Sequence, residues 1–122
     1  MEKPIDDLDF LSTIFKVLGD PTRLRLFSIL LKGVHCNCEL VTLTGLPNNL
    51  ISHHMHVLCD AGLIVSTRKK DDARWVFYSI NHEKIGQIQG VFGSFLKVED
   101  IPTREPECSK KKKKPNNQKR GS

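Results

Sequence analysis

Residues 33–81 read GVHCNCELVTLTGLPNNLISHHMHVLCDAGLIVSTRKKDDARWVFYSIN, and turn residues divide this stretch into four short elements. Gly45 and Gly62 each follow a helical pattern and stop it, as glycine commonly does after a helix. The basic loop RKKDDA separates two β-branched and aromatic runs, LIVST and RWVFYSI, which predict a hairpin. The expected order is a helix over Cys38 to Thr44, a helix from Pro47 to about Ala61, and strands over 63–67 and 74–80. This order predicts a helix-turn-helix followed by a β-hairpin, or wing.

Three further helices are expected around this unit. Leu8, Leu11, Phe15 and Leu18 recur at steps of three and four, which predicts an amphipathic helix over 8–18. Asp20-Pro21 is a good start for a second helix, whose surface is apolar enough for the core. The last helix is expected from about Glu83 to Val98. The fold class is therefore mainly α with a β-hairpin, a winged helix-turn-helix of four helices, two strands and a final helix.

The first and last helices are unusually apolar for the edge of a small domain. Ile85, Ile88, Val91, Phe92 and Phe95 form the apolar stripe of the last helix. We expect a homodimer through these two helices, because a second copy would cover both stripes. Burial within one chain is the alternative.

The helix from Pro47 has a polar face that suits the major groove of DNA. Ile51, Met55 and Leu58 should face inward, which leaves short hydrogen-bonding side chains outside. Such a face could simply contact water, but the preceding helix, the turn and the basic hairpin together favour DNA binding. Asp71 and Asp72 are expected to form the turn of the wing. The predicted DNA-binding residues are Asn48, Asn49, Ser52, His53 and His56 on the helix, and Arg68, Lys69, Lys70 and Arg74 on the wing.

The net charge of +5 is unevenly distributed along the chain. Residues 104–122 contain eight Lys and Arg against two Glu, a net of +6. The other 103 residues contain 11 basic and 12 acidic side chains, a net of −1. We therefore expect two parts, a DNA-binding and dimerisation domain over 1–100 and a flexible Lys-rich tail over 101–122. The tail either attracts DNA phosphates nonspecifically or only improves solubility.

Composition also excludes several classes of protein. No apolar run is long enough to cross a membrane, and the acidic N-terminus lacks the features of a secretory signal. We expect a cytoplasmic protein whose four cysteines are reduced and available for metal or redox chemistry. The chain lacks a CxxC in a βαβ context, an HExxH, a nucleophile elbow and a phosphate loop, so an enzyme is not expected.

The runs FKVLGDPTRLRLFSILL, residues 15–31, and ISHHMHVLCDAGLIVSTRKKDDARWVFYSI, residues 51–80, carry a family resemblance. They resemble the ArsR/SmtB family of metal-sensing winged-helix repressors, of the arsenic-responsive type, over residues from about 10 to 97. The resemblance implies a homodimer that binds palindromic double-stranded operator DNA and releases it when an inducer binds.

Cys36 and Cys38 fall where arsenic sensors of this family carry a cysteine motif. A helix N-terminus should lower the pKa of a thiol, and soft thiolates select soft ions. The expected inducer is As(III) or Sb(III), with no catalytic cofactor. The fuller motif can include a third cysteine, but that position is Val41 here. The predicted third ligand is Cys108; His35, a water or a small exogenous thiol are alternatives.

The spacing of the two cysteines suggests a coupling mechanism. Residues i and i+2 of a helix do not face each other, so both thiols can hold one ion only if the segment stays non-helical or unwinds. Binding would then distort the start of the helix that supports the DNA-reading helix. A redox or reactive-sulfur sensor, or a Cd(II) or Pb(II) sensor, would use the same thiols.

The other potential metal ligands are expected to have structural roles. Cys59 is expected to be a small buried residue. The alternative is that Cys59 and Cys108 together form a different site for a soft metal. His54 is expected to pack or to hydrogen-bond inside the fold. The zinc site that the family can carry on its last helix is not expected, because that segment offers only His82 and Glu83.

Overall fold

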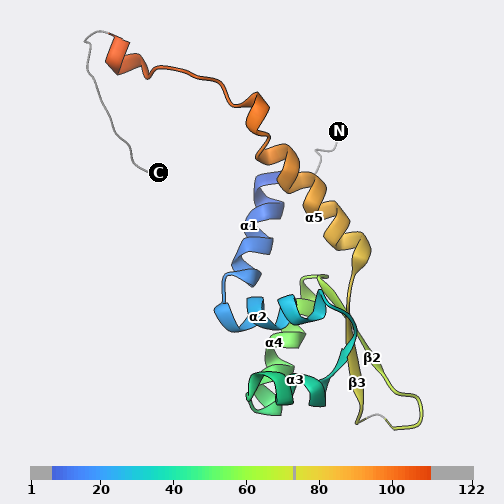
Figure 1. The fold of residues 1–122 in the computed structure, drawn as a ribbon. Helices are drawn as coiled ribbons and strands as arrows, with labels where there is room; N and C mark the ends of the chain where they lie inside the picture. The colour runs from blue at the N-terminus through green and yellow to red at the C-terminus, as the bar shows by residue number, and fades with distance from the viewer. Residues whose placement is uncertain (1–6, 73, 111–122) are drawn as a thin grey trace.

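The structure is a computed structural model that describes residues 7–72 and 74–110 (Figure 1). The predicted helices and the predicted hairpin are confirmed. The elements are α1 (Asp7–Leu18), α2 (Pro21–Leu30), β1 (His35–Cys36), α3 (Asn37–Thr44), α4 (Asn48–Asp60), β2 (Ile64–Arg68), β3 (Val76–Ile80) and α5 (His82–Phe95). The lysine run after Lys110 lies outside the described residues, so the prediction of a flexible tail there stays a prediction.

The core lies where α2, α3 and α4 meet the sheet. Ile51, Met55 and Leu58 of α4 are fully buried, as their spacing predicted. They pack with Leu26 of α2 and Leu40 of α3 in one apolar cluster. This packing fixes the inner face of α4 and leaves its opposite face to solvent.

Three local features stabilise the turn between α3 and α4. Gly45 takes a left-handed conformation, with φ of 74°, and donates its N–H to the Val41 carbonyl at 2.8 Å. The Leu46 N–H donates to the Thr44 hydroxyl at 3.2 Å. Pro47 has an extended backbone and immediately precedes α4. A residue with a Cβ would be strained at position 45, so the sequence specifies this turn.

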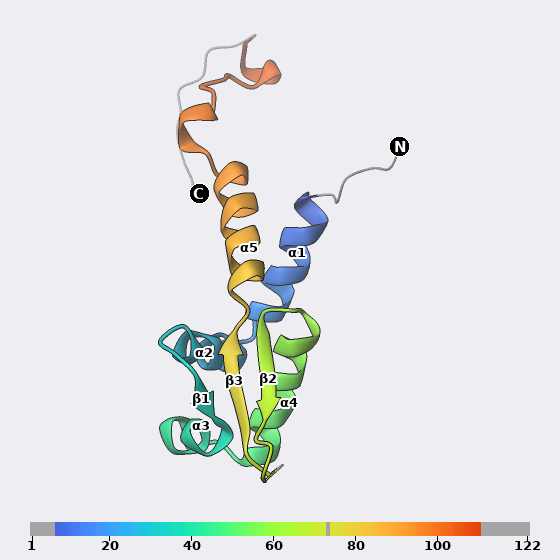
Figure 2. The same ribbon diagram turned by 90° about the vertical axis from the view of Figure 1, so that its right-hand side faces the viewer.

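The sheet has one strand more than the sequence predicted. The order is β1-β3-β2, and both pairs are antiparallel. β1 pairs Cys36 with Phe77 of β3, while β2 pairs Ser66 with Tyr78. β1 therefore joins the segment before α3 directly to the wing (Figure 2).

The start of α5 is anchored to the turn that follows α4. Asn81 is the N-cap, and its side-chain oxygen accepts the Lys84 N–H at 3.2 Å. Its amide nitrogen donates to the Gly62 carbonyl at 2.9 Å. Asn81 thus fixes α5 relative to the DNA-reading unit. α5 ends at Phe95, three residues before the predicted end, and a short 3-10 helix follows at Val98–Asp100.

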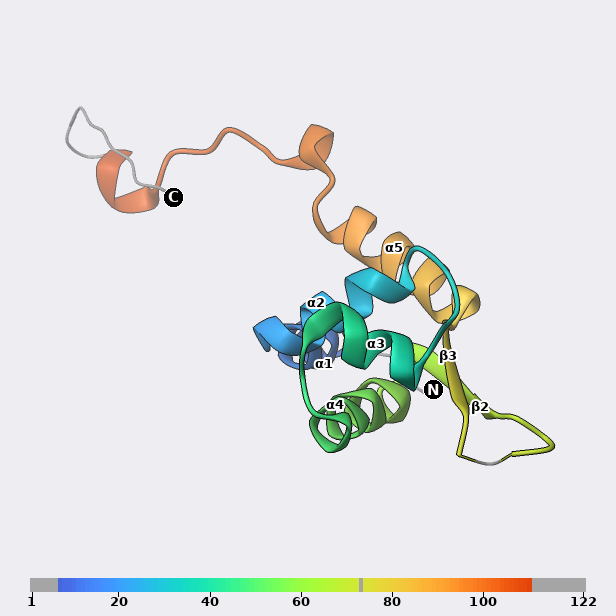
Figure 3. The same ribbon diagram turned by 60° about the horizontal axis from the view of Figure 1, so that its bottom comes forward.

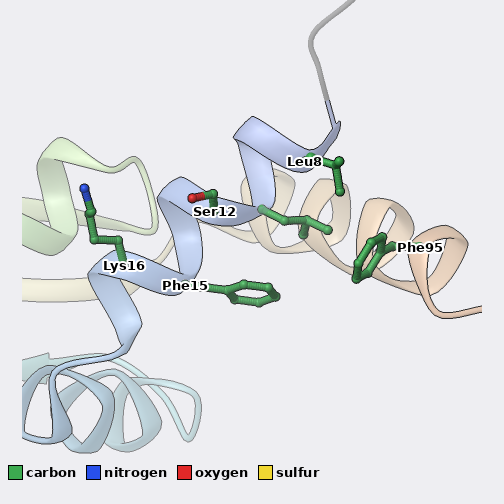
Figure 4. A pocket seen from close by; sticks show the side chains of 6 residues that line it. Leu8, Ser12, Phe15, Lys16 and Phe95 are labelled. Carbon is green, nitrogen blue, oxygen red and sulfur yellow. The ribbon is translucent and has the colours of Figure 1, made fainter.

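α1 and α5 pack side by side away from the sheet (Figures 1 and 2). Phe15 and Phe92 meet edge to face, with ring centroids 5.8 Å apart. Much of the apolar surface of these helices nevertheless stays open, since Phe15 is 49% exposed and Phe95 51%. Leu8, Phe15 and Phe95 border an open hollow of about 440 Å³ between the helices (Figure 4). Within the described residues, no helix is both long and apolar enough to cross a membrane.

Candidate DNA-binding surface and thiol site

The predicted outer face of α4 is exposed. Asn48, Asn49, Ser52, His53 and His56 all lie at the surface. His56 Nε2 lies 3.3 Å from Asp60 Oδ2, on the last turn of the same helix. α3 and α4 lie together at one end of the molecule, beside the hairpin (Figure 3). This face is free to approach a groove of DNA.

The wing carries the predicted basic side chains, and Arg74 among them pairs with a neighbouring carboxylate. Arg68, Lys69, Lys70 and Arg74 are all exposed. Arg74 binds the Asp72 carboxylate through Nε at 2.9 Å and Nη2 at 2.7 Å. Asp72 also accepts the Arg74 N–H, so it forms the turn as predicted. The bound guanidinium holds the pKa of Asp72 below its usual range.

A shallow hollow connects α4 with the wing. It measures about 260 Å³, and Ser52, His56 and Arg68 lie on its wall with Cys59 and Tyr78. Cys59 is half-buried, in keeping with its expected packing role, and burial raises the pKa of its thiol. Predicted DNA-binding residues from the two elements therefore border one common surface.

His54 is on the inner side of α4, as expected. It is 8% exposed, its Nδ1 lies 3.6 Å from Asp20 Oδ2, and Arg23 Nη1 lies 3.4 Å from the same ring nitrogen. Burial lowers the pKa of His54; the charges of Arg23 and His53 add to this, while Asp20 opposes it. His54 is a structural residue that links α4 to the start of α2.

The two predicted thiol ligands lie side by side. Cys36 is the N-cap of α3 and has an extended backbone, with φ of −90° and ψ of 163°. Cys38 follows in the first turn of the helix. Because Cys36 stays outside the helix, the two Sγ atoms approach to 2.7 Å while both cysteines are free thiols. The spacing required the segment either to stay non-helical or to unwind. Cys36 stays non-helical, so no unwinding is needed to bring the two sulfurs together.

The electrostatics of this pair differ from the expectation. The pKa of Cys38 lies above its ordinary value, because its thiol shares a hydrogen bond with Cys36 and because burial and the charges of Cys36 and Glu39 disfavour the thiolate. Glu39 accepts the Cys36 N–H at 2.8 Å, in the geometry of a capping box. The prediction that the helix N-terminus lowers the pKa is therefore wrong for Cys38, since these neighbours outweigh the helix.

Of the two thiols, Cys38 is accessible to a small molecule, while Cys36 is buried directly beside it. An open groove of about 430 Å³ is lined by His35, Cys38 and Glu39, together with Thr42 and Leu43 of α3. Cys108 is exposed, but the segment Glu107–Lys110 lies at the other end of the molecule from α3 (Figures 1 and 2). One chain thus brings Cys36 and Cys38 together and does not bring Cys108 to them. Among the described residues, no three His, Cys, Asp or Glu side chains form a metal-binding cluster.

Asn37, between the two cysteines, is a residue that the sequence analysis missed. Its side-chain nitrogen donates to Asn48 Oδ1 at 3.3 Å, and its oxygen accepts the Val76 N–H at a long 3.5 Å. These partners lie 11 and 39 residues away, so no local pattern could have indicated the contacts.

Comparison with known proteins shows the family to which this chain belongs. A family model described as "Bacterial regulatory protein, arsR family" matches residues 20–66. The arsenical resistance operon repressor of Staphylococcus xylosus is 41% identical over 78 residues, which cover 64% of this chain and 72% of that protein. The chain belongs to the arsR family.

Two further proteins are similar to this chain. An uncharacterised helix-turn-helix regulator of Methanocaldococcus jannaschii is 40% identical over 76 residues, 62% of this chain and 82% of that protein. The crystal structure of a possible transcriptional regulator for arsenical resistance is 27% identical, with a TM-score of 0.57, covering 73% of this chain and 96% of that one. This arsR-family chain is thus a DNA-binding transcriptional repressor and not an enzyme.

Proposed function

We propose that this repressor releases its operator when As(III) or Sb(III) binds Cys36 and Cys38. The observation that carries the proposal is the 2.7 Å separation of the two sulfurs at the head of α3, beside an open groove. Thiolate sulfur is the donor that soft ions prefer. Two arsenical resistance repressors of Staphylococcus species, about 40% identical to this chain, support arsenic as the inducer.

The chemistry of capture balances without an oxidant. Arsenous acid, As(OH)₃, exchanges two As–O bonds for two As–S bonds, and the two thiol protons leave as two molecules of water. The third position on arsenic keeps its hydroxide or takes another thiol. Cys108 can supply that sulfur only if a C-terminal segment, from either protomer, approaches α3.

The state of the thiols favours this chemistry over oxidant sensing. A redox-sensing cysteine is usually a low-pKa thiolate, because the thiolate is the nucleophile. The pKa of Cys38 is raised instead. Condensation with arsenous acid releases the thiol proton as part of a water molecule, so the raised pKa of Cys38 does not oppose it. Release by a redox or sulfur signal, or by Cd(II) or Pb(II), is the second candidate, and the adjacent sulfurs are its support.

The repressor is proposed to act in the cytoplasm as a homodimer on a palindromic duplex. The exposed apolar face of α1 and α5 supports dimerisation, because a second copy would bury Phe15 and Phe95. On each half-site, the polar face of α4 would contact base edges and the wing would contact phosphates. The residues proposed for these contacts are Asn48, Asn49, Ser52, His53, His56, Arg68, Lys69, Lys70 and Arg74.

The experiment is fluorescence anisotropy of the reduced protein on a labelled duplex from its own promoter. The duplex complex is titrated separately with As(III), Sb(III), Cd(II) and hydrogen peroxide. We expect As(III) and Sb(III) to release the DNA, and the Cys36→Ser/Cys38→Ser variant to bind DNA normally but to resist release. Cys59→Ser is the matched control and should respond like the wild type.

Two outcomes would contradict this proposal. Release by peroxide alone, reversed by a reductant, would assign the thiol pair to redox sensing. Loss of DNA binding in the double variant without any inducer would show that the thiols serve the fold. Cys108→Ser tests the third ligand, because a large fall in As(III) affinity would place that sulfur in the site.

A further inference from the structure

The side chain of Asn37 joins the thiol pair to both DNA-binding elements. Asn37 is the first residue of α3 and lies between Cys36 and Cys38 in the chain. The amide nitrogen of Asn37 donates a hydrogen bond to the side-chain oxygen of Asn48, the first residue of α4. The amide oxygen accepts one from the backbone N–H of Val76, the first residue of β3. Through one side chain, the thiol segment therefore contacts both α4, the proposed DNA-reading helix, and β3 of the wing.

We propose that Asn37 is the positioning residue that transmits inducer binding from the thiols to the DNA-binding surface. This inference rests on the proposed function, since it needs an ion held by Cys36 and Cys38. In the free protein, Asn37 holds the side chain of Asn48 and the start of β3 in one arrangement. Inducer binding breaks these two contacts, so that the wing and Asn48 are no longer fixed relative to each other.

Capture of an ion rearranges the two sulfurs. An ion bound by both sulfurs replaces their direct contact with two ion–sulfur bonds, each about 2.3 Å long. The side chains of Cys36 and Cys38, whose sulfurs contact each other directly in the free protein, must therefore take up a new arrangement when the ion is bound.

The contacts of Asn37 are poorly suited to survive such a displacement. At 3.3 and 3.5 Å they are longer than a typical N–H···O hydrogen bond of about 2.7–3.2 Å, and are therefore weak. The backbone of Cys36 is held in the sheet by its pairing with Phe77, which limits how far that side of the segment can yield. The displacement therefore falls on the first turn of α3, where Asn37 and Cys38 lie.

The amide group of asparagine is required for both contacts at once. Its nitrogen donates to Asn48 and its oxygen accepts from Val76, and an aspartate could only accept. Asn37→Ala removes both contacts, and Asn37→Leu removes both while keeping the number and branching of the side-chain heavy atoms. Together these variants separate a loss of hydrogen bonding from a loss of packing.

The chain contains its own reporter of inducer binding, independent of DNA. Trp75 is the only tryptophan in the sequence. It lines a hollow of about 270 Å³ together with Asn37, Cys38 and Arg74. Tryptophan fluorescence of the full-length protein, titrated with sodium arsenite, therefore measures binding at the thiols without DNA.

The test measures arsenite binding and DNA release side by side. For the wild type we expect arsenite to weaken DNA binding by at least about ten-fold, within the usual range of allosteric coupling. For Asn37→Ala and Asn37→Leu we expect arsenite affinity within about three-fold of wild type but a coupling of about three-fold or less. In NMR spectra, arsenite should shift the Val76 amide resonance of the wild type and leave it nearly unchanged in both variants.

The outcomes distinguish this inference from the proposed function. If both Asn37 variants bind arsenite and still release DNA as the wild type does, Asn37 is not the positioning residue, and the proposed function stands. If arsenite neither changes Trp75 fluorescence nor releases DNA from the wild type, the proposed function fails and the inference fails with it. If an Asn37 variant loses arsenite binding as well, Asn37 shapes the thiol site instead, which also overturns the inference.

Discussion

Replacing Asn81 by alanine should destabilise the protein by about 2 kcal/mol. The N-cap bond to the Lys84 N–H contributes about 1 kcal/mol, as N-cap side chains typically do. Loss of the bond to the half-buried Gly62 carbonyl costs about 1 kcal/mol more. For a domain of this size the sum corresponds to a fall in Tm of roughly 8 °C.

Urea unfolding followed by far-UV circular dichroism, at one fixed protein concentration, measures this change. Asn81→Asp should fall between the wild type and Asn81→Ala, because a carboxylate still accepts from Lys84 but cannot donate to Gly62. Exposed Lys32→Ala is the control and should change stability by less than about 0.5 kcal/mol. A loss below about 0.5 kcal/mol in Asn81→Ala would refute the reasoning that Asn81 anchors α5.

Three further predictions concern acid sensitivity, assembly and DNA affinity. Burial holds the pKa of His54 below its ordinary 6.5, so the unfolded state binds the proton more tightly and the free energy of unfolding should fall as the pH drops through 6.5. In urea titrations at several pH values, His54→Gln should reduce this dependence of stability on pH. An unchanged dependence would exclude His54 as its cause. Phe95→Glu should raise the Kd of the dimer at least about ten-fold in analytical ultracentrifugation, a cost of about 1.4 kcal/mol, unless α1 and α5 are not the interface. Asp72→Ala should free Arg74 to contact a phosphate and strengthen DNA binding several-fold at low salt. The plot of log affinity against log salt concentration should become steeper by about one unit. Unchanged affinity would mean that Arg74 does not contact DNA.

Local periodicity predicted the helices and the hairpin because their signals lie within a few residues. The inward set Ile51, Met55 and Leu58 and the stop at Gly45 are examples, and all four behave as expected. β1 was missed because a strand of two residues has no periodicity of its own and depends entirely on its pairing with β3. The end of α5 was placed three residues late because apolar residues continue past Phe95 without continuing the helix.

The candidate site was predictable in its residue types and less so in its geometry. The sequence indicated that Cys36 and Cys38 could meet only if the segment stayed non-helical or unwound, and the structure shows that Cys36 stays extended. The direction of the Cys38 pKa depends on the 2.7 Å contact between the sulfurs, which no spacing rule contains. The role of Asn37 depends on partners from two other elements and needed the fold.

The closed turn between α3 and α4 has a consequence for the timing of regulation. Because Gly45, the Thr44 hydroxyl and Pro47 fix this turn before DNA arrives, little conformational entropy remains to be lost when the helices enter the groove. Encounter with DNA should then depend mainly on diffusion and on electrostatic steering by the basic wing, which an inducer at the thiols barely alters. The inducer should therefore shorten the time that the repressor stays on its operator, and leave the rate at which it arrives almost unchanged.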